Sequence, residues 1–336
     1  MESLRKAHPV TQKFADLKGH DLPVSGRVLE LWSHPSLDGY GPLDSLGVDP
    51  SQLVLNDSAP TPDFSEVLKQ CGGVVRQDGD NNTKFGIGRL PLGTKDHNGF
   101  TVDYYRTDWD TWLSVRKYAE KHDEFRHRHM DTSAEGILLP QSMSLQYIVR
   151  FRNGDLLALQ RGDRVESQAG RWSFSGEEQL SKDDFGQGPT AAGIRLFRRT
   201  FLEEVYGLRP EEIAQADGDW EMDCQPMIKS MRLWSFFLEE TVGSIQMFGL
   251  FQLKVNPDEL KESHKRRTMN GKGARDNEGK LWIVPHTGIS ELLTRGYTFA
   301  TRLHRPEGAL VDAEGLHDTS RYRLWRLHCA LERKLR

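Results

Sequence analysis

Residues 190–208, TAAGIRLFRRTFLEEVYGL, decide the fold because they join a long helical pattern to two adjacent acids. We predict a helix over residues 190–205, with mixed apolar and basic character. Glu203 and Glu204 lie at its C-terminal end, where the helix dipole favours cations over anions. A divalent cation such as Mg2+, which prefers carboxylate oxygens, would compensate for this pair. The alternative is that the two acids pair with Arg198, Arg199 or Arg209 on the surface. Taken by themselves, the residues of this helix favour that alternative.

This helix resembles the signature helix of the Nudix hydrolase family. The family motif is Arg-Glu-apolar-any-Glu-Glu-any-Gly-apolar, and residues 199–208 read Arg-Thr-Phe-Leu-Glu-Glu-Val-Tyr-Gly-Leu. Thr200 stands where the family has its first helical glutamate, and one extra residue separates Glu204 from Gly207. In the family, acids four residues apart face one metal from a single helix face. The resemblance therefore implies metal ligands at Glu203 and Glu204.

Upstream, the segment GRWSFSGEEQL, residues 170–180, resembles the family's Trp-x-x-Pro-Gly-Gly turn. Ser175 replaces the proline and Glu177 replaces the second glycine. The family turn supplies a backbone carbonyl to the metal, so a carboxylate at Glu177 or Glu178 is placed to substitute for the acid missing at residue 200. The alternative for these two glutamates is an exposed acidic turn.

Downstream, EGKLWIVPHTGISELL, residues 278–293, resembles the family's closing segment, in which an acid precedes a Trp-Val-Pro strand. Glu278 then corresponds to a metal ligand or to the base that activates water, with Asp276 as the substitute candidate. The resemblance assigns catalysis to Glu278 and Glu204.

The stretch HKRRTMNGKGARDNEGK, residues 264–280, is basic and glycine-rich, and we predict a mobile loop there. It could clamp phosphates, although charge runs in long loops are usually only solvated. Candidate clamp residues are Lys265, Arg266, Arg267, Lys272 and Arg275. Within the resemblance, the candidate substrate-binding residues are Arg199, Trp172, Lys272 and Arg275.

The composition limits the classes of function. A formal net charge of -4 over 336 residues gives no overall attraction to nucleic acid or to an anionic membrane. The apolar runs are far shorter than the roughly 20 residues needed to cross a bilayer. Three separated cysteines, together with an N-terminus that lacks a secretory pattern, favour a cytoplasmic protein with reduced thiols.

The pattern along the chain predicts two domains and an α/β fold class. We expect a smaller α+β domain over residues 1–135, with short strands and a helix that begins at Asp108. We expect a Nudix-like domain over residues 136–336, with a mixed sheet sandwiched between helices. The resemblance is to a Nudix subgroup with an extra N-terminal domain and a divergent motif. Predicted strands of the second domain include SLQYIVRF and LLALQRG, which are joined by a turn at Asn153-Gly154-Asp155.

The resemblance implies a pyrophosphohydrolase that uses Mg2+ or Mn2+ to hydrolyse a nucleoside diphosphate linked to another moiety. A rival interpretation is a catalytically degenerate Nudix-like domain that senses a nucleotide-type small molecule or regulates a partner. Thr200 and the extra residue before Gly207 favour the rival, whereas Glu177, Glu178 and Glu278 favour the enzyme. We expect no membrane partner. The net acidity disfavours a nucleic-acid partner. A homodimer is an open alternative.

Overall fold

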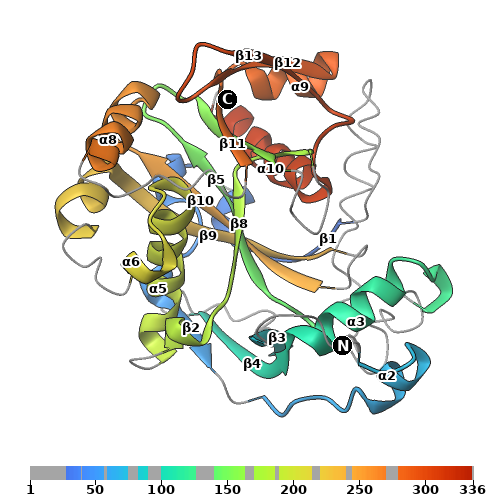
Figure 1. Ribbon diagram of the computed structural model, residues 1–336. Helices are drawn as coiled ribbons and strands as arrows, with labels where there is room; N and C mark the ends of the chain where they lie inside the picture. Colours follow the sequence, from blue (N-terminus) through green and yellow to red (C-terminus); the bar gives the residue numbers. More distant parts are fainter. Residues whose placement is uncertain are drawn as a thin grey trace.

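A large mixed sheet forms the centre of the protein (Figure 1). The computed structural model describes residues 28–38, 40–56, 59–74, 82–89, 100–125, 140–162, 170–185, 189–213, 220–239, 244–269 and 279–334. The strand order is β1-β9-β10-β5-β6-β11-β12-β13, with β7 beside β6 and β8 beside β5. Its strands are β1 (Val28–Ser33), β5 (Ser144–Arg150), β6 (Leu156–Arg161), β7 (Trp172–Ser173), β8 (Gly176–Gln179), β9 (Ile228–Glu239), β10 (Ser244–Leu253), β11 (Gly279–Val284), β12 (Tyr297–Arg302) and β13 (Gly308–Asp312). Among the described strands of this sheet, β5 and β10 pair in parallel and the other pairs are antiparallel.

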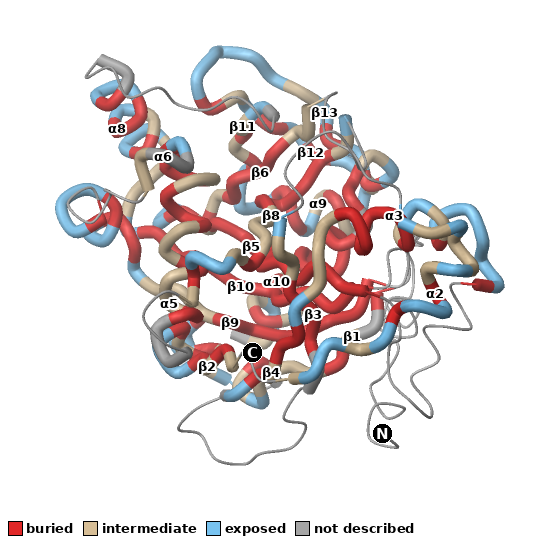
Figure 2. Tube along the Cα trace, turned by 60° about the horizontal axis from the view of Figure 1, so that its bottom comes forward, coloured by how far each residue is buried: buried red, intermediate tan, exposed pale blue. Residues whose placement is uncertain are grey.

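Helices cover both faces of this sheet. Side chains alternate along a strand, so Leu145 and Tyr147 of β5 join one core cluster while Ile148 joins the other. The first cluster includes α5 (Pro189–Thr200), and the second includes α9 (Gly288–Arg295) and α10 (Asp318–Lys334). Figure 2 shows the central strands as the most continuously buried part of the chain. None of the described helices is both long and apolar enough to span a membrane.

Other helices are short or lie at the rim. They are α2 (Ser65–Gln70), α3 (Trp109–Ala119), α6 (Pro210–Ile213) and α8 (Pro257–Met269). Five 3-10 turns lie at Pro35–Asp38, Leu43–Ser45, Pro50–Gln52, Lys182–Phe185 and Gln225–Met227 among the described residues. Two π-helical segments, Phe201–Val205 and Trp220–Cys224, flank α6 in the chain.

A smaller sheet has the order β2-β4-β3, from β2 (Leu53–Asn56), β4 (Phe100–Asp108) and β3 (Thr83–Arg89). As predicted, a helix follows Asp108, whose side chain caps α3 by accepting from the Thr111 backbone N at 2.9 Å. β1 belongs to the large sheet, beside β9. One core cluster contains Leu53 and Phe85 of the smaller sheet together with Leu196 of α5. The domain boundary near residue 135 stays a prediction.

Met143 joins the two sheets. Its backbone N donates to the Phe85 carbonyl of β3 at 2.8 Å, and its carbonyl accepts from the Leu180 backbone N, just after β8, at 3.0 Å. The Ile87 backbone N also donates to Gln141 at 3.3 Å. Because one short segment bonds to both sheets, β3 and the end of β8 lie close together.

The α/β fold class, with a mixed sheet between helices and a second small sheet, is confirmed and is consistent with the predicted Nudix-like arrangement. The strands predicted at SLQYIVRF and LLALQRG are present as β5 and β6, and the Trp-Val-Pro strand lies in β11. The helix predicted over residues 190–205 is present as α5, and the π-helical segment Phe201–Val205 continues it. The loop prediction for residues 264–280 is wrong at its start, because residues 264–269 belong to α8. The sequence analysis also missed β8, β12 and β13.

Gly193 sets how closely α5 packs on the smaller sheet. A Cβ there would lie 2.6 Å from the Pro50 carbonyl oxygen and 2.8 Å from the Leu53 carbonyl oxygen. We expect Gly193→Ala to lower the free energy of unfolding by about 1 to 3 kcal/mol, the usual cost of overpacking. Gly308→Ala is the control, since its nearest contact would be 3.8 Å away. Equal stability of the two variants in urea titrations would contradict this packing.

Candidate functional site

Glu177 and Glu178 lie on β8, at a fork of the sheet where β5 changes its neighbouring strand. The start of β5 pairs with β8, whereas its last residue, Arg150, pairs with β6. Ser175 fills the gap: its hydroxyl donates to the Leu157 carbonyl at 2.7 Å and accepts from the Val149 backbone N at 2.9 Å. A proline side chain has no such group. Ser175 at the predicted proline position is thus a structural bridge between β5 and β6.

Arg323 of α10 donates hydrogen bonds to the same part of the sheet. Its side chain is buried, and Nη1 donates to the carbonyls of Tyr147 and Gly176 at 2.9 and 3.1 Å. Nη2 donates to the hydroxyls of Ser320 and Ser173 at 2.9 and 3.1 Å. Burial lowers the pKa of Arg323 to about 10, and the nearby Glu177 carboxylate opposes that shift. Arg323 was not among the predicted site residues, so this anchor was missed.

Arg199 is surrounded by acids. Nη1 donates to Glu178 at 2.5 Å and lies 3.5 Å from Glu203, while Nη2 and Nε donate to Asp184 at 2.9 and 3.0 Å. Nη2 also donates to the Gln179 carbonyl at 2.5 Å. Burial disfavours the charge of Arg199, but Glu178 and Asp184 outweigh burial and raise its pKa above the ordinary value. The guanidinium is therefore a fixed positive charge between the two acidic segments.

The two departures from the family motif have structural counterparts on the helix. Thr200 is fully buried, and its hydroxyl donates back to the Leu196 carbonyl at 2.7 Å. The chain then widens into the π-helical segment Phe201–Val205, where the Tyr206 backbone N donates to the Phe201 carbonyl at 2.8 Å. A π-helical turn takes up one more residue than an α-helical turn. The extra residue before Gly207 is accommodated in this way.

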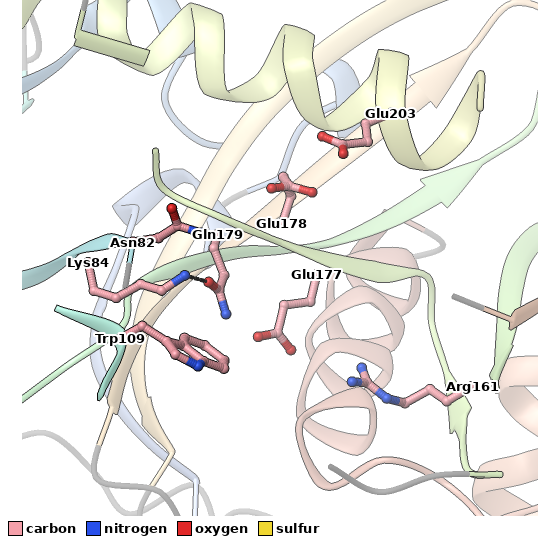
Figure 3. A pocket seen from close by; sticks show the side chains of 8 residues that line it. All are labelled: Asn82, Lys84, Trp109, Arg161, Glu177, Glu178, Gln179 and Glu203. Carbon is pink, nitrogen blue, oxygen red and sulfur yellow. Dashed lines mark hydrogen bonds between the residues drawn. The ribbon is translucent and has the colours of Figure 1, made fainter. Parts of the chain in front are cut away.

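A cavity of about 420 Å3 opens beside this turn (Figure 3). β8 contributes Glu177, Glu178 and Gln179, and the π-helical segment contributes Glu203. The opposite wall comes from the smaller sheet and α3, and one end comes from β6; the residues there are Asn82, Lys84, Trp109 and Arg161. Carboxylates and cations thus face one another across a space large enough for a small molecule.

The structure brings three predicted metal ligands together, since Glu177, Glu178 and Glu203 line this one cavity. Glu204 and Arg199 are not among its lining residues. Trp172 is buried, with its ring centroid 5.3 Å from that of Trp282. Lys272, Arg275, Asp276 and Glu278 lie outside the described residues. The roles assigned to all of these side chains stay predictions.

The sequence analysis missed the lining residues Asn82, Lys84 and Arg161. Trp109, on the helix predicted to begin at Asp108, also lines the cavity. Its backbone N donates to the Asn82 carbonyl at 2.9 Å, which fixes the start of α3 beside β3. A tryptophan directly after the Asp108 cap was the available signal, because the first turn of a helix is often open on one side.

The described side chains do not fit a divalent metal ion as they stand. Within that part of the chain, no three His, Cys, Asp or Glu side chains are grouped so that they could hold one. Glu178 and Glu203 instead share the guanidinium of Arg199. One oxygen of Glu178 and one of Glu203, which a hard cation would otherwise use, thus already face a side-chain cation.

No family model matches the chain, and a search of curated proteins also finds no match. The chain is similar to a solved structure described as "Tm1382, a putative Nudix hydrolase", with a TM-score of 0.29 and 10% identity over 56% of this chain and 69% of that one. It is also similar to DR0079 from Deinococcus radiodurans, with a TM-score of 0.22 and 14% identity over 40% and 77% of the two chains. Similarities this low establish no shared function.

His264 of α8 fixes the end of the π-helical segment. Its Nε2 donates to the Val205 carbonyl at 2.9 Å, which leaves Nδ1 to accept from His304 at 3.1 Å. Arg267 on the same helix, predicted as a loop clamp, is buried and donates to the Gly207 carbonyl at 2.8 Å. Burial, followed by His304 and Arg267, lowers the pKa of His264 to about 3.

This pKa predicts acid sensitivity. Below the ordinary histidine pKa of about 6.5, the unfolded chain binds a proton at His264 that the folded chain does not. The free energy of unfolding therefore falls by about 1.4 kcal/mol per pH unit for this group between pH values of roughly 6 and 4. We expect His264→Gln to remove that part of the slope in urea titrations at several pH values. Parallel slopes in the wild type and the variant would show that His264 titrates normally.

Proposed function

We propose that the cavity binds a nucleotide-type small molecule without a resident divalent metal ion, and that the chain acts as a ligand-binding module. The position of Arg199 between Glu178 and Glu203, at 2.5 and 3.5 Å, carries this proposal. It supports the second of the two functions that the sequence left open, a degenerate Nudix-like domain with a sensing or regulatory role.

Electrostatics gives the physical reason. Two unit charges about 4 Å apart interact by roughly 4 kcal/mol at an effective dielectric constant of about 20. A divalent cation placed beside Glu178 and Glu203 would meet the charge of Arg199, and that repulsion offsets much of the attraction. The side chain of Thr200 adds no carboxylate, because it is a buried hydroxyl bonded to Leu196.

A metal-dependent pyrophosphohydrolase is the second candidate. The observation in its favour is that Glu177, Glu178 and Glu203 line the same cavity. Activity of this kind would require Arg199 to release Glu178 and Glu203. It would also need a base such as Glu278.

Calorimetric titration with α,β-methylene-ADP, a non-hydrolysable nucleoside diphosphate analogue, tests the proposal. We expect binding in EDTA, and a dissociation constant that changes by less than about threefold, below 1 kcal/mol, when Mg2+ or Mn2+ is added. The comparison includes the double variant Glu178→Gln, Glu203→Gln and the control Glu314→Gln, whose side chain is exposed. Binding that needs the metal, and is lost in the double variant but not in the control, would establish the hydrolase candidate instead.

The effect of the Arg199 charge on Mg2+ binding can be tested separately. Arg199→Gln leaves Glu178, Asp184 and Glu203 without their shared cation, so we expect the variant to gain affinity for Mg2+. The gain should appear as stabilisation by saturating Mg2+ on the order of 1 to 3 kcal/mol, measured by thermal unfolding against EDTA. Arg199→Lys keeps the positive charge and should behave like the wild type. Equal Mg2+ responses in all three proteins would refute the inhibiting role of this charge.

A further inference from the structure

Lys84 is a cation that the smaller sheet adds to the cavity. It lies near the start of β3, opposite Thr107 of β4, and its ammonium lies 4.6 Å from the centroid of the Trp109 ring. Its Nζ donates to the side-chain oxygen of Gln179 on β8 (Figure 3). Lys84 therefore bridges the two walls of the cavity.

The ammonium of Lys84 keeps unused donor capacity. A lysine ammonium has three N–H donors, and the Gln179 bond uses one of them. The Trp109 ring attracts the charge through its π face but supplies no lone pair. Hydrogen bonds to an oxygen-rich ligand can take up the remaining donors without breaking either contact.

The charged groups around Lys84 are closely balanced. The cavity is lined by Glu177, Glu178 and Glu203 together with Lys84 and Arg161. Asp184, Arg199 and Arg323 are near these lining residues. The four carboxylates are matched by four cations, which are Lys84, Arg161, Arg199 and Arg323. With all eight groups charged, their charges sum to zero, so an anion that enters beside Lys84 meets no net negative charge from them.

Burial leaves the Lys84 charge poorly solvated. Its pKa is lowered to about 8, mainly by burial, while Glu178 raises it and Arg199 lowers it further. An ammonium in this state gains more from a bound anion than an exposed lysine does, because little hydration is lost on binding.

We infer that Lys84 directly binds an anionic, phosphate-type group of the ligand, with Arg161 as the second cation on the other side of the Glu177 carboxylate (Figure 3). The inference rests on the proposed function and adds to it the contact for the charged part of the ligand. It also gives the smaller sheet a role, because Lys84 and Trp109 are the groups by which that part of the chain reaches the ligand. Trp109 is a positioning residue, held 4.8 Å from Trp112 between ring centroids.

Calorimetric titration of the protein with inorganic pyrophosphate in EDTA tests whether Lys84 binds the anion. At pH 8 about half of the free Lys84 side chains lack a proton if the pKa is about 8, so anion binding should draw in on the order of half a proton per site. Calorimetry in two buffers with different ionisation enthalpies measures this uptake. Lys84→Arg should keep the affinity within about threefold and lose that part of the uptake, whereas Lys84→Met should bind at least about tenfold more weakly.

Lys254→Met serves as the matched control, because Lys254 is exposed just after β10 and the substitution should be without effect. The inference is overturned if Lys84→Met binds pyrophosphate as tightly as the wild type, or if the wild type does not bind pyrophosphate. The nucleotide analogue separates the two proposals. If it binds in EDTA while pyrophosphate does not, the metal-free nucleotide site stands and the anion contact fails. If pyrophosphate binds and the analogue does not, the anion contact stands and the nucleotide function fails.

Discussion

The candidate site depends on the hydrogen bonds that the buried guanidinium of Arg323 donates from α10 to the turn before β8. They reach the carbonyls of Tyr147 and Gly176 and two serine hydroxyls, so one side chain fixes backbone on both strands of the fork. A guanidinium suits this position because its rigid, planar set of donors can satisfy several acceptors at once. Through this turn, a helix near the C-terminus sets where Glu177 and Glu178 lie.

A second guanidinium sets the electrostatic character of the site. Arg199 is bonded to Glu178 of β8 and Asp184 of the following 3-10 turn, and it lies near Glu203 one helical turn away. Three acids that would otherwise repel one another are thereby held in place on three elements. The same contacts engage one oxygen of Glu178 and one of Glu203 that a metal ion would otherwise use. Stability of the acidic wall and affinity for a divalent cation therefore oppose each other here.

The smaller sheet completes the cavity instead of standing apart from it. Met143 bonds to both β3 and the residue after β8, and the close approach at Gly193 brings α5 onto the same sheet. Lys84 and Trp109 are consequently placed opposite the acids. A small molecule in this cavity would contact residues from both sheets.

The sequence by itself determined the α/β class, most strands and helices of the larger sheet, and the acidic turn and helix that meet at the cavity. These features depend on local periodicity and on short motifs, which adjacent residues specify. Only the tertiary structure decided which distant residues contact one another at the site. Arg323 reaches Gly176 across 147 positions and Lys84 reaches Gln179 across 95, and no local pattern records such contacts. The π-helical turn that absorbs the extra residue before Gly207, and the contact of Arg199 with Glu178 across 21 positions, likewise follow from packing and charge in three dimensions. The contact of Arg199 with Glu203, four positions away, was among the alternatives that the sequence offered.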